Sequence, residues 1–344
     1  MLGVRGGGQL GRMFAQAAQR MGYRVSVLTP EPAAPTAQLA DRKVIADYGD
    51  EDAVQALAKD VAVVTFEFEN IPTAATRAAR EFAPVRPHGE VLHHTQDRLR
   101  ERSLLRRLGL PCAQHAPVRS REELDVAVPS VGMPAILKTA AWGYDGKGQR
   151  RIHTHEEALQ AWLELGQTVA FPLLHNEHSN HILDITTCPA PQLAMFPKLG
   201  QEAGEIIRTI LDGLEVVGVL CVEMFLLESG ALIVNEIAPR PHNSGHVTLD
   251  SHSINQFELQ VRSICGLPLG NTVQHAPAAM VNLLGDVWQG GAPNFARALE
   301  LPGSHLHLYG KGAARPGRKL GHITVPAEAA GLAREQALRA RDLL

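Results

Sequence analysis

The first part of the chain, up to Pro87, alternates between short apolar runs and amphipathic runs, and this alternation constrains the fold more than any other feature. Short apolar runs are typical of buried strands, and amphipathic runs place apolar residues on one face of a helix. Strands that alternate with helices predict a parallel sheet with helices on its faces. The expected strands are residues 2–5, 23–28, 43–46 and 61–66, and the expected helices are residues 12–21 and 51–58.

A glycine-rich loop joins the first expected strand to the first expected helix. Its pattern, Gly6-x-Gly8-x-x-Gly11, fits the dinucleotide fingerprint, and Glu31 stands near the position of a ribose-binding acid. Backbone N–H groups at the start of a helix also suit any phosphate or small anion. A tight turn without a ligand is a further alternative. One hypothesis is therefore a nicotinamide-dependent dehydrogenase, which would have to bind NAD.

Composition narrows the class of protein. A chain of 344 residues has material for two or three domains, and 45% hydrophobic with 20% charged residues is typical of a soluble protein. A net charge of -3 gives no argument for nucleic-acid binding. The four cysteines have no paired spacing, which favours free thiols, and no apolar run reaches transmembrane length. We expect a cytoplasmic protein without a signal peptide and without a nucleic-acid or membrane partner.

Two acidic residues stand on a predicted β-hairpin, whose strands are residues 216–225 and 231–234. Antiparallel pairing can place Glu223 and Glu236 on the same face, with the amide oxygen of Asn235 beside them. Hard oxygen ligands of this kind suit a Mg²⁺ ion that is also bound by the phosphates of a nucleotide. The alternative is a solvated hairpin with ordinary surface acids. Glu236 lies between apolar runs, where an unpaired carboxylate is costly, so we favour the metal site.

A second glycine-rich loop, residues 143–148, follows the expected strand 135–139. Such a loop can fold over nucleotide phosphates, with Lys138 reaching them from the strand and Lys147 from the loop. No Gly-Lys-Ser/Thr sequence opens a helix here, so the loop is not a P-loop. The alternative is a glycine-rich hairpin on the surface.

Two further patterns carry charge or metal-binding side chains. Residues 311–319 hold four cations stiffened by Pro316, which suits an anion clamp, although a solvated basic turn is equally consistent with the sequence. His175, His178 and His181 suggest zinc, but their spacing is not a standard zinc pattern and no cysteine pair accompanies them. We therefore disfavour zinc.

Taken together, the motifs resemble those of the 5-(carboxyamino)imidazole ribonucleotide synthases, ATP-grasp enzymes of bacterial purine synthesis. They occur in the family's order over nearly the whole chain. The motifs are Gly6–Met13, Thr65–Pro72, Lys138, Gly143–Gln149, Asn235–His246, Gln256–Glu258 and Arg315–His322. The resemblance implies an α/β ATP-grasp fold of three domains. These are a Rossmann-like N-terminal domain (1–97), a small α+β central lid domain (98–166) and a larger α+β C-terminal domain (167–344).

The resemblance also implies the reaction. ATP and bicarbonate would carboxylate 5-aminoimidazole ribonucleotide through carboxyphosphate, with release of ADP and phosphate, and the family precedent is a homodimer. A close alternative is another ATP-grasp ligase, such as a formate-dependent glycinamide ribonucleotide transformylase. The dehydrogenase hypothesis leaves the metal hairpin and the basic tail unexplained. A non-catalytic nucleotide-binding module is a third alternative, which would bind ATP without turnover.

The family's functional residues can be carried over to matching positions. The implied ATP contacts are Arg98, Lys138, Gly143, Tyr144, Asp145, Gly146, Lys147, Gly148, Gln149, His178, Asn235 and Glu236. The implied Mg²⁺ ligands are Glu223 and Glu236. The implied ribonucleotide contacts are Gln9, Leu10, Glu67, Asp145, Asn243, Ser244, Lys311 and Arg318, of which the last two would hold its 5′-phosphate. The implied catalytic residues are Lys138, Asp145, Arg240 and His242.

One part of the family pattern is absent after Gly166. There the family has two strands and a hinge that supply the adenine contacts and a ribose-binding Glu. In this sequence an expected helix, residues 156–165, runs almost directly into Thr168. The missing piece is roughly two dozen residues. We predict that the sequence omits residues of the full protein, and that a chain without them binds ATP poorly.

Overall fold

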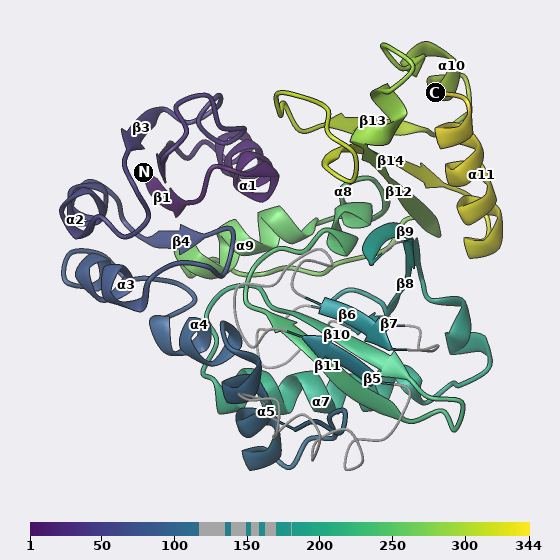
Figure 1. The fold of residues 1–344 in the computed structure, drawn as a ribbon, viewed down its shortest axis with the longest axis horizontal. Helices are drawn as coiled ribbons and strands as arrows, with labels where there is room; N and C mark the ends of the chain where they lie inside the picture. The colour runs from purple at the N-terminus through teal and green to yellow at the C-terminus, as the bar shows by residue number, and fades with distance from the viewer. Residues whose placement is uncertain (117–134, 139–148, 153–157, 162–169, 180) are drawn as a thin grey trace.

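The structure is a computed structural model that describes residues 1–116, 135–138, 149–152, 158–161, 170–179 and 181–344. Its strands form a four-stranded, a two-stranded and an eight-stranded sheet (Figure 1). The two-stranded sheet pairs β5 (Ala135–Lys138) with β6 (Gln149–Ile152) in antiparallel fashion. The expected loop at 143–148 and the expected gap after Gly166 lie outside the described residues.

The N-terminal sheet has the strand order β3-β2-β1-β4, and each pair of neighbours is parallel. The predicted parallel sheet is therefore confirmed. β1, β2 and β4 are buried along their whole length, as expected for a parallel sheet covered on both faces. The elements of this part are β1 (Leu2–Arg5), α1 (Gln9–Arg20), β2 (Val25–Thr29), β3 (Arg42–Ile45), α2 (Glu51–Lys59), β4 (Val64–Phe66), α3 (Thr73–Arg80), α4 (Gly89–Thr95) and α5 (Arg98–Arg107).

A helix from the second half of the chain anchors the N-terminal unit. Phe14 on α1 belongs to the same buried cluster as Phe257 and Val261 on α9 (Gln256–Cys265). Figure 1 shows α9 running from below the N-terminal sheet toward the centre of the molecule. The helix begins where Asn255 caps it, with its side chain accepting bonds from the N–H groups of Phe257 and Glu258.

The eight-stranded sheet has the order β11-β10-β7-β8-β9-β12-β14-β13, and its described pairs are antiparallel. It therefore connects the predicted metal hairpin, β10–β11, with the C-terminal strands. Its strands are β7 (Ala158–Ala161), β8 (Leu174–Ser179), β9 (Ile182–Cys188), β10 (Cys221–Leu226), β11 (Leu232–Ala238), β12 (Ala278–Leu284), β13 (His305–Leu308) and β14 (Lys319–Pro326). The remaining helices of the described residues are η1 (Pro191–Ala194), α7 (Leu199–Gly213), η2 (Ser244–Val247), α8 (Thr248–Ser251), η3 (Gly285–Trp288), α10 (Phe295–Leu299) and α11 (Ala330–Asp342).

The helix expected over residues 156–165 is wrong for Ala158–Ala161, which form strand β7. This strand lies between β10 and β8 and pairs with both. The run Ala-Leu-Gln-Ala has helix-forming residues, but intrinsic propensity is a weak preference that tertiary context overrides. Without β7, β10 and β8 would each lose a pairing edge.

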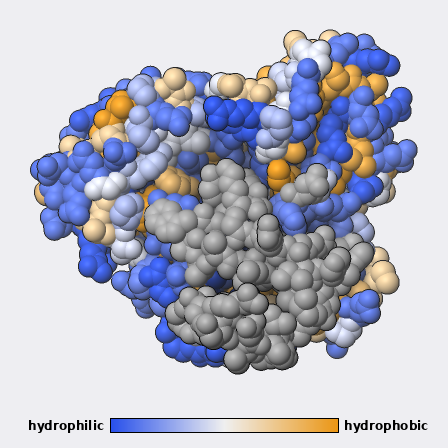
Figure 2. Space-filling model, in the orientation of Figure 1, coloured by the Kyte–Doolittle hydropathy of each residue, from blue (hydrophilic) through white to orange (hydrophobic). Residues whose placement is uncertain are grey.

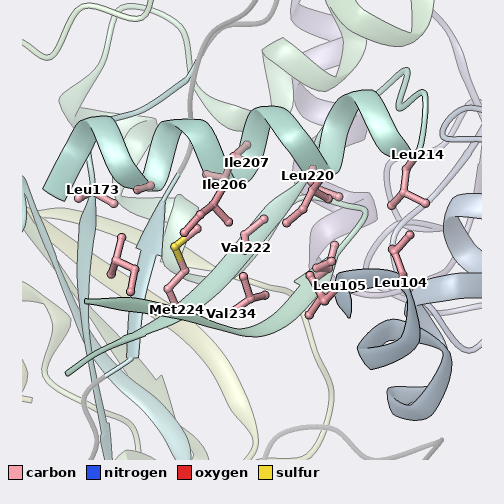
Figure 3. Close-up of a cluster of buried hydrophobic side chains, with 14 of the residues drawn as sticks. Leu104, Leu105, Leu173, Ile206, Ile207, Leu214, Leu220, Val222, Met224 and Val234 are labelled. Atoms are coloured by element: carbon pink, nitrogen blue, oxygen red, sulfur yellow. The ribbon is translucent and has the colours of Figure 1, made fainter. Parts of the chain in front are cut away.

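One face of the β10–β11 hairpin is covered by α7 and α5. Figure 3 shows α7 lying over the hairpin, with Ile206 and Ile207 directed toward Val222 and Met224. Leu104 and Leu105 of α5 join the same cluster. Since successive side chains on a strand point to opposite faces, the residues between these apolar positions point away from the core. Glu223 lies between Val222 and Met224 and is thereby directed to the open face of the hairpin.

The C-terminal helix α11 packs on β12 and β14 through buried alanines. Arg334 of α11 forms a two-bond ion pair with Glu177 of β8, at 2.6 Å for each bond. Arg341 pairs with Asp184 of β9. These pairs attach the helix to the middle of the sheet.

The surface is mainly hydrophilic on the described parts of the face in Figure 2, with apolar residues in scattered patches. Such scattered apolar residues are normal for a globular protein. Within the part of the chain that the structure describes, no helix is both long enough and apolar enough to cross a membrane.

Candidate active site

A β-bulge shapes the predicted metal hairpin. Glu223 is opposite Glu236, but the next residue of β10, Met224, is opposite Val234. The register therefore skips Asn235, which is the extra residue of the bulge. A bulge breaks the alternation of side chains along a strand. It thus allows two neighbouring polar residues, Asn235 and Glu236, to serve one site.

The side chains of the hairpin present oxygen atoms of the kind that a metal ion binds. The amide Nδ2 of Asn235 donates to Oε2 of Glu223 at 3.3 Å, which leaves its Oδ1 oxygen for another partner. Glu236 is partly exposed and forms an ion pair with Arg98, Nη2 to Oε2 at 3.3 Å. Two carboxylates and an amide oxygen fit the chemistry of Mg²⁺. The predicted ATP contact Arg98 thus lies at the predicted metal ligand.

The main chain of β11 is held from outside the sheet. The guanidinium of Arg102 donates to the carbonyls of Val234 and Asn235, at 2.9 and 2.6 Å. The carboxylate of Glu101 accepts the N–H of Ile237 at 2.9 Å. Burial raises the pKa of Glu101 to about 7, and the charge of Glu236 adds to the shift.

Arg240 and His242 follow β11 directly and lie beside the hairpin. Nε of Arg240 is 2.8 Å from Oε1 of Glu69. Burial alone would lower the pKa of Arg240, but its neighbours, Glu69 first and then Glu236, together raise it, so the guanidinium stays charged. Nε2 of His242 lies 3.5 Å from Oε1 of Glu223. Burial and the charges of Arg240 and Lys319 lower the pKa of His242 well below its usual value, so the imidazole is neutral at pH 7.

The segment that carries His242 is fixed by a buried glutamine. Gln256, at the start of α9, accepts the main-chain N–H of His242 at 2.9 Å and donates to its carbonyl at 2.8 Å. The ring Nδ1 of His242 lies 2.9 Å from Oγ of Ser244. The side-chain amides of Asn243 and Asn282 donate a hydrogen bond to each other, at 3.1 and 2.7 Å. The segment is therefore held at both its backbone and its side chains.

Glu67 reaches the site from the end of β4. Its carboxylate accepts the N–H groups of Gly8 at 2.5 Å and Gly11 at 3.0 Å. Burial raises the pKa of Glu67, and these two bonds partly offset the shift. The charges of Arg240 and Lys311 also act on Glu67. Residues predicted from the N-terminal sheet, the metal hairpin and the basic tail therefore come together.

The basic loop lies between β13 and β14. The ammonium of Lys311 is 5.6 Å from the ring centre of Tyr309, and Arg318 donates to the carbonyl of Ala313 at 3.1 Å. Gln38 of the N-terminal unit donates to the carbonyl of Gly310 at 2.8 Å. The loop that carries Lys311 is thus tied to the N-terminal unit.

Other predicted site residues differ in what they can offer a ligand. Leu10 is buried in the N-terminal core, and Ser244 is fully buried with its hydroxyl beside His242, so neither offers an exposed side chain to a ligand. Gln9 begins α1 and is partly exposed. His178 lies on β8 and is exposed.

The structure does not describe the side chains of the remaining predicted contacts. Lys138 ends β5 and Gln149 begins β6, where the two residues are register partners. The predicted contacts Gly143, Tyr144, Asp145, Gly146, Lys147 and Gly148 lie outside the described residues. Their roles stay predictions.

Histidine clusters give little support for a second metal. Among the described residues, the group that brings three possible ligand atoms within 4.8 Å of one another is Asp250, His307 and His322, so His175, His178 and His181 form no such group. The rings of His307 and His322 are stacked, with an interplanar angle of 15° and centroids 4.5 Å apart. The lone pairs of nearly parallel rings cannot converge on one ion.

Several residues of the site were not identified from the sequence. They are Glu69, Glu101, Arg102, Gln256 as a backbone clamp, and Asn282. Glu69 and Gln256 stand within motifs that had been recognised, which is a signal that could have found them. Arg102 contacts residues more than 130 positions away, and no local pattern reveals such a contact.

Three family models match the chain in order. The ribonucleotide synthetase preATP-grasp domain matches residues 1–96, the ATP-grasp domain matches residues 103–167 and 163–257, and the phosphoribosylaminoimidazole carboxylase C-terminal domain matches residues 278–336. The bulged hairpin with its paired glutamates lies within the second of these. The fold is therefore that of an ATP-grasp protein.

Curated relatives narrow the class to one family. The N5-carboxyaminoimidazole ribonucleotide synthases of Bacillus subtilis and Pseudomonas aeruginosa are each 38% identical to the chain and cover 94% of it, with 90% and 94% of their own lengths matched. The chain belongs to the N5-carboxyaminoimidazole ribonucleotide synthase family. The predicted resemblance and fold class are thus confirmed.

Solved structures agree with this assignment. An N5-carboxyaminoimidazole ribonucleotide synthetase in complex with ADP has a TM-score of 0.92 and 37% identity, covering 98% of this chain and 95% of its own. The Aspergillus clavatus enzyme in complex with ADP and 5-aminoimidazole ribonucleotide has a TM-score of 0.87 and 29% identity, covering 100% and 98%. These likenesses extend over nearly the whole chain.

Proposed function

We propose that the chain carboxylates 5-aminoimidazole ribonucleotide to 5-(carboxyamino)imidazole ribonucleotide in purine biosynthesis, using ATP and bicarbonate and releasing ADP and phosphate. The observation that carries the proposal is the meeting of three segments at one site. The bulged hairpin offers Glu223 and Glu236, the segment after it offers Arg240 and His242, and Glu67 lies within reach of the charge of Arg240. A transfer from ATP to a second substrate needs such a junction.

In the first step a bicarbonate oxygen attacks the γ-phosphorus of ATP, and the bond to ADP breaks. This gives carboxyphosphate. Phosphoryl transfer depends mainly on positioning and on neutralising charge. Arg240 supplies a permanent positive charge beside the hairpin, and Arg98 supplies another at Glu236. The neutral ring of His242 can donate or accept one hydrogen bond without adding charge.

In the second step the exocyclic amine attacks the carboxyl carbon. A C–N bond forms, phosphate leaves, and the amine loses a proton. We assign Asp145 to orient the amine or accept this proton. Glu67 and Lys311 would hold the ribonucleotide, with Lys311 and Arg318 at its 5′-phosphate.

The hairpin would hold Mg²⁺ through Glu223 and Glu236, with Asn235 beside them. When bound, the ion would neutralise charge on the nucleotide phosphates. The donor set fits a hard cation, because it consists of carboxylate and amide oxygens. Arg98, which now pairs with Glu236, would then be free to turn to a phosphate.

The proposed absence of the adenine segment has support from two observations. The ATP-grasp model matches in two stretches that meet at residues 163–167. The alignment with the Bacillus subtilis protein runs over 355 residues, more than the 344 of the chain, although it covers 94% of it. The relative therefore has positions without a counterpart here. A nucleotide-binding module without turnover is the second candidate function, favoured by this gap.

We further propose a cytoplasmic homodimer, following the family precedent. The test of function is ADP release by the purified protein with Mg²⁺-ATP and bicarbonate, with and without 5-aminoimidazole ribonucleotide. We expect release that depends on the ribonucleotide, and a product that carries one added carboxylate by mass spectrometry. Nucleotide binding without ADP release would instead support the second candidate.

A further inference from the structure

The strand that carries Glu236 lies at the edge of its sheet. β11 is the outer strand of the eight-stranded sheet and pairs with β10 on one side. The outer edge of an edge strand has N–H and C=O groups that no neighbouring strand pairs. Where these groups are buried, they need hydrogen-bond partners from outside the sheet. The outer edge of β11 obtains these hydrogen-bond partners from α5 and from the segment that follows α5. The N–H of Val234, for example, donates to the carbonyl of Pro111 at 3.1 Å.

The contacts of α5 lie at the bulge. Arg102 binds the carbonyls of Val234 and Asn235, directly before Glu236, and Glu101 binds the N–H of Ile237, directly after it. Both side chains are buried, with 8% and 1% of Arg102 and Glu101 exposed. The main chain is therefore clamped on both sides of the predicted metal ligand, where the regular pairing with β10 is interrupted.

We propose that Arg102 and Glu101 are positioning residues that fix the bulge of β11, so that Asn235 and Glu236 face the metal-bound nucleotide together. The inference rests on the proposed function, because it concerns the same site. An arginine suits this role since its planar group offers two donors at a fixed spacing, which matches two successive carbonyls. A lysine offers a single point charge and cannot fix both carbonyls in the same way.

The same helix also reaches the site directly. Arg98 precedes Arg102 by four positions, so the two side chains lie on one face of α5. Arg98 pairs with the carboxylate of Glu236, while Arg102 holds the main chain that carries it. One rigid helix face thus sets both the backbone and the charge environment of the predicted ligand.

The test compares the affinity for ADP with Mg²⁺ and with a chelator, measured by calorimetry. Arg102→Met keeps most of the apolar stem and removes the donors. We expect it to reduce the Mg²⁺-dependent gain in ADP affinity at least tenfold, or about 1.4 kcal/mol, while affinity in chelator changes less than twofold. We expect kcat to fall by a similar factor and Arg102→Lys to restore part of both. Arg106→Met, which changes an exposed arginine of the same helix, should behave as wild type.

Glu101 provides an independent pair of variants. Glu101→Gln keeps an oxygen that can accept the N–H of Ile237, whereas Glu101→Leu removes it. We expect the first variant to retain at least half of the Mg²⁺-dependent gain in affinity and the second to lose most of it. If Arg102→Met does not fold, Arg102→Lys and Glu101→Leu decide the matter in the same assay.

The proposal is overturned if these variants lower only the thermal midpoint and keep the Mg²⁺-dependent affinity and kcat of wild type. In that case the contacts with β11 serve stability alone. A wild-type protein that binds ADP equally with and without Mg²⁺, and releases no ADP from ATP, would instead contradict the proposed function. The two failures are therefore distinguished by the behaviour of the wild type.

Discussion

Oε1 of Glu67 lies 2.5 Å from the main-chain nitrogen of Gly8, and Oε2 of the same carboxylate accepts the N–H of Gly11. The anion at the start of α1 is therefore a side chain of the protein. In a dinucleotide-binding protein the corresponding groups face a pyrophosphate. The glycine pattern in this chain serves close approach of a carboxylate, which removes the main support for the dehydrogenase hypothesis.

Gly8→Ala tests this close approach. The φ angle of Gly8 is -77°, which any residue can adopt, but a Cβ atom there would lie 2.6 Å from Oε1 of Glu67. We expect a loss of about 1–3 kcal/mol in the free energy of unfolding and a raised KM for the ribonucleotide, measured by urea titration and steady-state kinetics. Gly331→Ala is the control, because nothing lies within 4 Å of its Cβ position. Equal stability of the two variants would contradict the prediction.

Glu236→Gln tests the metal hairpin. The change keeps the shape of the side chain and removes its charge, so the fold should survive while ADP formation falls below detection. The measurement is ADP release with Mg²⁺-ATP and bicarbonate, together with circular dichroism. Glu228→Gln, in the exposed turn of the same hairpin, should be fully active. Normal turnover of Glu236→Gln would contradict the assignment of Glu236 as a metal ligand.

Lys311→Met tests the ribonucleotide site. Loss of a charged hydrogen bond to a phosphate is worth about 1.5–3 kcal/mol, so KM for the ribonucleotide should rise tenfold or more. KM for ATP should stay unchanged, because Lys311 stands in the loop between β13 and β14 and its charge acts on Glu67 of the N-terminal unit. Arg297→Met changes an exposed cation outside this loop and provides the control. A rise in KM for ATP alone would assign Lys311 to the other substrate.

Glu101→Gln tests the pH dependence of stability. Burial raises the pKa of Glu101 from its usual 4.5 to about 7. Between these pH values the folded state binds more protons than the unfolded state, so the free energy of unfolding falls as pH rises, by up to roughly 3 kcal/mol. Glutamine does not titrate. The free energy of unfolding of the variant, relative to that of wild type, should therefore increase from pH 5 to pH 8. Urea unfolding in chelator at both pH values measures this gain, and an unchanged difference would refute it.

Selectivity for the base tests the adenine segment. If the chain lacks those contacts, ATP is held mainly through its phosphates, and GTP should replace it with less than tenfold loss in kcat/KM. The measurement is ADP or GDP release under identical conditions. A preference for ATP above a hundredfold would show that the protein has an adenine clamp.

Local patterns in the sequence were sufficient to predict the elements that are determined by residues close together in the chain. The parallel N-terminal sheet and the hairpin of Glu223 and Glu236 follow from alternation and turn residues, and both are confirmed. The bulge at Asn235 and the clamp by Arg102 could not be predicted in the same way, because they depend on packing of segments far apart in the chain. β7 was mistaken for a helix for the same reason, since its pairing with β10 overrides the preference of its residues.

The shared sheet has a consequence for dissecting the protein. The ATP-grasp model ends at residue 257 and the C-terminal model begins at residue 278, which suggests a cut in the stretch between the end of α9 at Cys265 and the start of β12. However, β9 and β12 are hydrogen-bonded neighbours in the middle of the eight-stranded sheet. Severing the chain there would give two fragments, each with one strand that has lost its partner along an edge that was interior in the intact molecule. Such edges pair with other chains, so the fragments should aggregate when made separately and should reassemble only when made together.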